Sequence, residues 1–173
     1  VSDIDSLLTE VTDTDVILPI ITSSIQLMKD TPIADVLSTL VVLLDLFNNE
    51  LSIALMQKKW GLLKKIILEV PVSDKEIRVD MGDARQLNLT PNTATLLITS
   101  PPYINVFNYH QKYRRSVEAL GYDVLTIAKN EFGSNRKNRG NRLLTVIQYC
   151  IDMSLSLKEA VRVCQPNSRM IYV

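Results

Sequence analysis

Residues 94–103 read Ala-Thr-Leu-Leu-Ile-Thr-Ser-Pro-Pro-Tyr, an apolar run that stops at a polar residue, two prolines and an aromatic ring. The apolar part is typical of a strand that is buried on both faces in the middle of a parallel sheet. Pro101 and Pro102 lack backbone N–H donors and have a fixed φ, so the strand ends before them. Because a proline keeps the preceding residue extended, we expect a stiff loop at the carboxyl end of the strand, where open α/β sheets place their ligand sites.

This loop presents three groups that are suited to holding a nucleic-acid base. The Ser100 hydroxyl and the Pro101 carbonyl are hydrogen-bond acceptors, and Tyr103 has a flat ring. An exocyclic amino group is a poor nucleophile because its lone pair is delocalised into the base. Two acceptors that hold its hydrogens would direct that lone pair at an electrophilic methyl group, and positioning of this kind lowers a reaction barrier. A ring stacked on the base would add about 1–3 kcal/mol of binding.

The residues Thr99-Ser100-Pro101-Pro102-Tyr103 resemble the catalytic motif of the amino-group DNA methyltransferases. These enzymes methylate cytosine at N4 or adenine at N6 with S-adenosyl-L-methionine. Their motif is Asp, Asn or Ser, then Pro-Pro and an aromatic residue, and the serine form favours cytosine N4. The resemblance implies an α/β fold with a partial Rossmann-like sheet, parallel central strands flanked by helices, and catalytic roles for residues 100–103.

A proline-rich docking peptide is the alternative interpretation of this loop. A WW-domain ligand has the pattern Pro-Pro-x-Tyr, whereas Tyr103 follows Pro102 directly, and the Pro-x-x-Pro pattern of an SH3-domain ligand is absent. A docking peptide also does not normally follow a buried strand. The sequence therefore favours a catalytic loop.

A further strand and a turn are expected upstream of this loop. Residues 77–81 alternate between apolar and polar and predict a strand, and residues 82–85 predict a turn. In the methyltransferase family a Gly-Asp loop precedes the Pro-Pro strand, so the resemblance implies that Asp83 accepts the amino group of the cofactor adenine. An ordinary Gly-Asp turn is the alternative. We expect residues 77–81, 94–99 and 169–173 to be neighbouring parallel strands, since a helical crossover separates the last two.

The net charge of zero hides a strong asymmetry along the chain. Residues 112–142 contain eight basic and three acidic residues, a net charge of +5, whereas residues 1–56 contain nine acidic residues and one lysine, a net charge of −8. A basic segment after a base-holding loop is suited to phosphate contacts, and a solvated loop is the alternative. The residues expected to bind DNA are Arg114, Arg115, Arg136, Lys137, Arg139 and Arg142.

Helices are expected in the first third of the chain and before the last strand. Thr31 and Pro32 predict an N-cap and the first helical residue, and the apolar pattern that follows predicts one or two helices as far as Leu68. Residues 143–164 predict one long helix, followed by a turn at 165–168. Its apolar face is expected to include Leu144, Ile147, Ile151, Leu155, Ala160 and Val161.

The beginning of the chain resembles the end of the second strand of the cofactor domain in this family. There an acid, here Asp3, binds the ribose hydroxyls, and a frayed N-terminus is the alternative. The family's cofactor loop is similar to Asp-Pro-Phe-x-Gly-Ser-Gly, and no two of the five glycines are close enough to form it. We therefore expect one partial catalytic domain over residues 1–173, mostly helical over 1–70 and carrying the catalytic loop in 71–173, and inactive as an isolated fragment.

Several other classes of protein are disfavoured by the composition. One histidine makes a Ser-His-Asp triad or a multi-histidine metal site improbable. Cys150 and Cys164 lack metal-ligand spacing and are expected to be reduced and buried. No apolar run reaches the ~18 residues of a membrane span, and no signal-peptide pattern is present. We expect a cytoplasmic protein without a metal or a membrane partner.

Three functions therefore stay open from the sequence. The first is a DNA methyltransferase that acts on a flipped base with S-adenosyl-L-methionine. The second is an inactive, truncated remnant that binds DNA, and the third is an RNA or protein-amide methyltransferase of the same superfamily. The basic segment and the serine favour DNA over a protein amide, whereas the missing cofactor loop favours inactivity of the isolated chain. The sequence predicts neither the recognised DNA site nor the oligomeric state.

Overall fold

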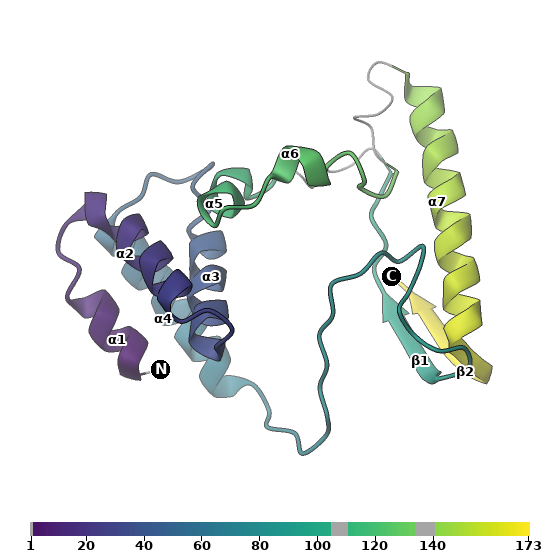
Figure 1. Ribbon diagram of the computed structural model, residues 1–173, viewed down its shortest axis with the longest axis horizontal. Coiled ribbons are helices and arrows are strands. Elements are labelled where there is room, and N and C mark those ends of the chain that lie inside the picture. Colours follow the sequence, from purple (N-terminus) through teal and green to yellow (C-terminus); the bar gives the residue numbers. More distant parts are fainter. Residues whose placement is uncertain (1, 105–110, 134–140) are drawn as a thin grey trace. The chain divides into compact units, whose positions relative to one another are not determined.

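A computed structural model describes residues 2–104, 111–133 and 141–173, and of Arg142 only the backbone. The chain is α/β and forms two compact units (Figure 1). The helical unit contains Val1–Asp74 and His110–Val124, and the sheet unit contains Lys75–Tyr109 and Leu125–Val173. The chain therefore leaves the helical unit after residue 74, returns to it at residue 110 and leaves it again after residue 124.

Helical caps set the boundaries of several helices in the helical unit. Its helices are α1 (Ser2–Thr9), α2 (Thr14–Leu27), α3 (Pro32–Leu44), α4 (Ile53–Glu69) and α5 (Arg114–Ala119). The predicted cap of α3 is confirmed, since the Thr31 Oγ1 accepts the Ala34 N–H at 3.4 Å and Pro32 is the first helical residue. The Ser52 Oγ caps α4 in the same way by accepting the Leu55 N–H at 3.2 Å. Such caps stabilise a helix by about 1 kcal/mol each.

The core of the helical unit lies where α3 packs against α2 and α4. Leu37, Leu40 and Leu44 of α3 are fully buried, as is Met56 of α4. The expectation that Met56 and Trp60 are core residues is confirmed, because Trp60 is only 7% exposed. Burial of a leucine side chain contributes about 1.5–3 kcal/mol, so this cluster is a main source of stability in the unit.

Three polar contacts attach the outer helices α1 and α5 to this core. The Trp60 Nε1–H of α4 donates to the Asp5 carboxylate of α1 at 2.7 Å, and Lys64 pairs with the same carboxylate. Hydrogen bonds from Lys64 and Trp60 lower the pKa of Asp5. The Leu46 N–H donates to the buried Ser116 Oγ of α5 at 3.1 Å. This bond joins α5 to the first part of the chain.

The predicted strand end at residues 1–5 is wrong, because Ser2–Thr9 forms α1. Ile4 and Leu8, one helical turn apart, are both 3% exposed and attach this helix to the core. Acidic residues are also favourable in the first turn of a helix, where Asp3 and Asp5 lie. Asp3 is exposed in this turn rather than at the end of a strand.

Gly61 offers a direct test of helix propensity in α4. It lies inside the helix, and no heavy atom of the described residues lies within 4 Å of the place its Cβ would take. Glycine in a helix destabilises by roughly 0.5–1 kcal/mol relative to alanine. We expect Gly61→Ala to raise the free energy of unfolding by that amount, measured by urea denaturation with the fluorescence of Trp60 as the probe.

Gly121 supplies the matched control for this substitution. It also has open space around its Cβ position, but its φ is +90°, which side chains other than glycine rarely adopt. Gly121→Ala should therefore lower the free energy of unfolding. A decrease for both variants would contradict the propensity argument for Gly61.

The sheet unit contains two parallel strands and a long helix. β1 (Ala94–Thr99) pairs in parallel with β2 (Cys164–Tyr172), and α7 (Arg142–Val163) precedes β2 directly and packs against it. Figure 1 shows both strands running back alongside α7. The short helix α6 (Val124–Ile127) lies at the boundary between the two units. The predictions of parallel strands at 94–99 and 169–173 and of a long helix before β2 are confirmed.

The predicted turn at residues 165–168 is an irregularity within β2. From the pair Ala94–Cys164 to the pair Leu96–Arg169, β1 advances by two residues and β2 by five. Asn167 has a φ of 66°, in the left-handed region, and Pro166 has no N–H to donate. Turn-forming residues therefore loop out of the strand without ending it.

The predicted strand at residues 77–81 is wrong. These residues have no regular secondary structure, and Ile77, Val79 and Met81 are 76%, 91% and 103% exposed. Within the described residues the sheet consists of β1 and β2 alone. Alternation of apolar and polar residues stabilises a strand only where a neighbouring strand and an apolar surface are present, and in the described part of the chain residues 77–81 pair with no strand and stay exposed.

The expected burial of β1 and of the apolar face of α7 is also wrong. Leu96 and Ile98 are 51% and 63% exposed. Of the six residues expected on the apolar face of α7, Ala160 is buried and the other five are exposed. The expected burial of Cys150 is likewise wrong: it is an exposed free thiol, whereas Cys164 is free and buried. A two-stranded sheet and one long helix leave part of each other's apolar surface uncovered.

No helix in the described part of the chain is both long enough and apolar enough to cross a membrane.

Candidate functional site

The loop Ser100–Tyr103 lies at the carboxyl end of the sheet and is attached to the end of β2. The Val173 N–H donates to the Thr99 carbonyl at 3.0 Å, and the Ser100 Oγ donates to the Val173 carbonyl at 3.4 Å. Pro101 and Pro102 are partly buried, whereas Ser100 and Tyr103 are exposed. The ends of two parallel strands therefore present a hydroxyl and an aromatic ring to solvent on a stiff backbone.

The predicted turn at residues 82–85 is present, and hydrogen bonds to Asp83 stabilise it. The Gln86 N–H donates to the Asp83 carbonyl at 2.9 Å, and the Arg85 N–H donates to the Asp83 Oδ1 at 2.8 Å. The second bond is the side-chain-to-backbone bond by which aspartate stabilises turns. We call residues 82–86 the Asp83 turn.

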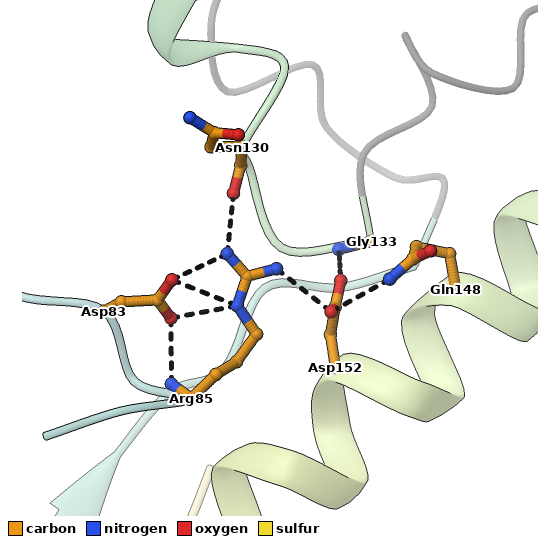
Figure 2. A network of polar contacts seen from close by, with 6 residues as sticks. All are labelled: Asp83, Arg85, Asn130, Gly133, Gln148 and Asp152. Carbon is orange, nitrogen blue, oxygen red and sulfur yellow. Dashed lines mark hydrogen bonds and ion pairs between the residues drawn. The ribbon is translucent and has the colours of Figure 1, made fainter.

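The Arg85 side chain lies between two carboxylates (Figure 2). Its Nη2 donates to the Asp83 Oδ2 at 2.7 Å and to the Asn130 carbonyl at 3.0 Å, and its Nε donates to the Asp83 Oδ1 at 2.9 Å. Its Nη1 donates to the Asp152 Oδ1 at 3.0 Å. The hydrogen bond from Arg85 lowers the pKa of Asp83, and the hydrogen bond to Asp83 raises the pKa of Arg85. Asp83 is thereby held as an ionised acceptor.

Asp152 is the buried end of this network. Its side chain is 3% exposed, and it also accepts from the Gln148 Nε2 at 3.0 Å and from the Gly133 N–H at 2.8 Å. Sequence reasoning assigned no role to either Arg85 or Asp152. One signal was available, since Asp152 is the only charged residue in the stretch 143–157.

A second ion pair on α7 fixes the segment that follows the Asp83 turn. The Glu159 carboxylate accepts from Arg162 at 2.7 Å and from the Leu87 N–H at 2.9 Å. Arg162 donates to the carbonyls of Leu87 and Leu89 at 2.9 and 2.8 Å. The hydrogen bond from Arg162, followed by the bond from Leu87, lowers the pKa of Glu159 to about 2. The segment before β1 therefore runs along α7 and is bonded to it at two places, through Asp152 and through the pair of Glu159 and Arg162.

The Asp83 turn and the loop Ser100–Tyr103 lie at the same end of the sheet unit. The Thr93 N–H bonds to the Val163 carbonyl at 2.8 Å, so β1 begins level with the end of α7. From that level, β1 runs to Thr99, a length of about 17 Å at about 3.3 Å per strand residue. The part of α7 between Val163 and Asp152 lies beside it and has the same length, about 17 Å at about 1.5 Å per helical residue. The Arg85 network is therefore level with the carboxyl ends of the strands.

Three of the other predicted site residues belong to the helical unit. Asp3 is in α1, and Arg114 and Arg115 are in α5, all in the helical unit. Arg114 pairs with Glu118 at 2.7 Å, and the Arg115 guanidinium lies 5.9 Å from the centre of the Phe47 ring. Arg136, Lys137 and Arg139 lie outside the described residues, and Arg142 begins α7.

No set of three His, Cys, Asp or Glu side chains among the described residues is placed to hold a metal ion. Comparison of the chain with protein-family models, curated proteins and solved structures gives no match.

Proposed function

We propose that this chain is the catalytic-loop part of a DNA methyltransferase that modifies the exocyclic amino group of a flipped base, with cytosine N4 favoured over adenine N6. The observation that carries the proposal is the loop Ser100–Tyr103, which follows a parallel strand and exposes Ser100 and Tyr103. Open α/β sheets bind their ligands at this position. DNA is favoured as the partner by the basic segment 112–142.

The hydrogen-bond direction at Ser100 agrees with the proposed role. The hydroxyl donates its hydrogen to the Val173 carbonyl, so its lone pairs face away from that bond and are available to accept. Together with the Pro101 carbonyl they would accept both hydrogens of a base amino group. Tyr103 would stack on the base, and S-adenosyl-L-methionine supplies the electrophilic methyl group when bound.

The resemblance assigns Asp83 to the adenine end of that cofactor. Three N–H groups of Arg85 make four hydrogen bonds to its carboxylate, two to each oxygen, which matches the roughly four lone-pair sites of a carboxylate. An adenine amino group would therefore have to displace one of these bonds, and the Asp83 side chain is 49% exposed. No residue of this chain is assigned to the methionine end of the cofactor.

Binding of a base by Tyr103 tests the proposal directly. A duplex with an unpaired, extrahelical cytosine should bind more tightly than the fully paired duplex, because the flipping cost is absent. Tyr103→Ala should weaken binding of that duplex by about 1–3 kcal/mol, whereas Tyr103→Phe, which keeps the ring, should not. Fluorescence anisotropy titrations measure both. Equal affinity of the Ala and Phe variants would remove the stacking role.

Methyl transfer tests the role of Ser100 and is measured on the full gene product. Ser100→Ala should leave DNA binding intact and slow single-turnover transfer by less than about 10²-fold, because the Pro101 carbonyl remains. Ser100→Asp should be slowed less, since a carboxylate also accepts from the amino group. If Ser100→Ala reacts as fast as the unmodified protein, Ser100 is only a turn residue.

An inactive DNA-binding protein is the second candidate, and the absence of a Gly-rich loop among the five glycines favours it. It predicts salt-dependent DNA binding by the full gene product without any transfer of labelled methyl groups.

A further inference from the structure

The uncovered side of α7 carries an unbroken row of uncharged side chains. At 3.6 residues per turn, this row lies opposite Thr145 and Asp152, which are buried and each 2% exposed. The members of the row are all exposed, and they are Leu143, Ile147, Cys150, Ser154, Leu157 and Val161. We call these six residues the α7 seam. It is a largely apolar surface that the packing of α7 against β2 leaves open.

The spacing of the seam is that of a coiled coil. Its members are alternately four and three residues apart, so the row repeats every seven residues. A row of this period stays in contact with a second helix when the two helices coil around each other. Ile147 and Val161 take the a positions and Leu143 and Leu157 the d positions, a combination that favours two parallel helices. The pattern therefore indicates a parallel helix as the partner, and a second copy of the chain supplies one with the same seam.

We propose that the α7 seam joins two copies of this chain, with their α7 helices packed in parallel as a two-stranded coiled coil. A two-fold axis along the helices places each seam residue opposite the same residue of the partner copy and closes the assembly at two chains. The contact does not depend on the proposed function, because neither DNA nor a cofactor takes part in it.

The charges of α7 are compatible with this pairing. Between residues 143 and 157 the only charged residue is Asp152, and it lies on the buried side of the helix. Lys158 follows Leu157 at the edge of the seam, where a long side chain keeps its ammonium group in water. Two seams can therefore meet without burying a charge that lacks a partner, which would be costly. A strongly acidic or basic partner would find no opposite charge on the seam itself.

A groove of about 550 Å³ lies on the seam and gives the partner helix a place to enter. Four of its lining residues, Cys150, Met153, Ser154 and Leu157, take successive d, g, a and d positions. Four residues of one helix in this arrangement form the hole that receives a side chain from position a of the facing helix. Cys150 and Ser154 are small, so the two helices can approach closely at this level.

The length of α7 sets the expected strength of the dimer. Its 22 residues span about 33 Å and the helix is about 10–12 Å wide, so the seam side has an outline of roughly 300–400 Å² on each copy. The relief of the side chains raises the accessible area buried by a pair to about 1,000 Å², the lower limit for a specific interface. We therefore expect a weak, reversible dimer with a dissociation constant in the micromolar range.

Analytical ultracentrifugation of the 173-residue chain over about 1–100 μM tests the dimer. The average mass should rise with concentration from that of one chain toward that of two. Leu157→Lys should raise the dissociation constant at least about tenfold, because it places two like charges opposite each other. Leu155→Lys is the matched control and should keep the dimer, since Leu155 and Leu157 are each 42% exposed but Leu155 lies outside the seam.

Cross-linking of Cys150 tests the parallel direction. In parallel helices the two Cys150 thiols lie at the same level, so oxidation by copper–phenanthroline should link the two chains through a disulfide. Cys150→Ser should abolish the link, because the other cysteine, Cys164, is only 6% exposed. Addition of Leu155→Cys to that variant is the control, and it should not restore the link.

Three results would overturn the interface as proposed. The first is a chain that stays monomeric up to the highest concentration, and the second is an equal loss of the dimer in Leu155→Lys and Leu157→Lys. The third is a dimer in which Cys150 cannot be linked, because its helices would not be parallel. Circular dichroism shows whether each variant keeps its helices. Should Leu157→Lys not fold, Ser154→Lys takes its place at an exposed position of the seam, and a dimer of unchanged affinity in that variant would likewise overturn the interface.

Discussion

Truncation of Leu40 to alanine should lower the free energy of unfolding of the helical unit by about 2–5 kcal/mol. Leu40 is fully buried in α3, which packs against α2, α4 and α5. The loss comes from the methyl groups returned to water and from the cavity that three neighbouring helices cannot close. Urea denaturation followed by the fluorescence of Trp60, the only tryptophan of the chain, measures this unit by itself.

Leu62→Ala is the control for this substitution. Leu62 lies on α4 of the same unit and is 48% exposed. The same chemical change there should cost less than about 1 kcal/mol, because much of the side chain is already in water and no closed cavity is formed. Equal losses at the two positions would mean that the packing of α3 does not determine the stability of the unit.

Replacement of Arg85 by methionine should destabilise the sheet unit by about 3–5 kcal/mol, because it leaves the buried Asp152 carboxylate without its cation. The Arg85 side chain is 22% exposed, so solvent screens this pair less than it screens a surface pair. The buried thiol of Cys164 reports on the sheet unit. Its labelling rate across a urea series, in a Cys150→Ser background, gives the free energy of opening.

Two further variants distinguish the cost of a buried unpaired charge from the cost of losing an ion pair at the surface. Arg78→Met removes the exposed pair with Asp80 in the same unit, whose side chains are 68% and 58% exposed, and should cost about 1 kcal/mol or less. Arg85→Met combined with Asp152→Leu should recover part of the loss, since no charge is then buried alone. The recovery is incomplete because Gly133 and Gln148 lose their acceptor. A loss for Arg85→Met no larger than for Arg78→Met would contradict the buried-charge argument.

Local chemistry predicted α3, α7 and the two paired strands. The Thr31 cap and Pro32 set the start of α3, the apolar pattern gave α7, and the crossover between residues 99 and 169 required β1 and β2 to be parallel. Each of these signals acts over a few residues or through a general rule of chain connection.

Burial and long-range pairing could not be predicted in the same way. The sequence of β1 shows that Leu96 and Ile98 are apolar, but their exposure depends on which other elements pack there. The returning segment is held by the bond between Leu46 and Ser116 and by the packing of Ala119 and Leu120 on the core, and the Asp83 turn is held by the pair of Arg85 and Asp152. These partners are far apart in sequence and have no local signature. The end of β1 at Thr99, directly before the loop Ser100–Tyr103, was predicted correctly, because prolines after an apolar run mark a strand end directly.

The interleaving of the two units along the chain has a consequence for the order of folding. Helices α1 to α4 pack through contacts within the first 69 residues, so this core can form early during synthesis. β1 cannot pair until β2 has been synthesised, because Ala94 pairs with Cys164, the first residue of β2. The segment that returns to the helical unit and the whole of α7 lie between these two residues in the sequence. Closure of so long a loop is entropically costly and slow. The nascent chain therefore exposes the apolar residues of β1 for longer than any part of the helical core, and this strand is where we expect chaperones or aggregation to act first.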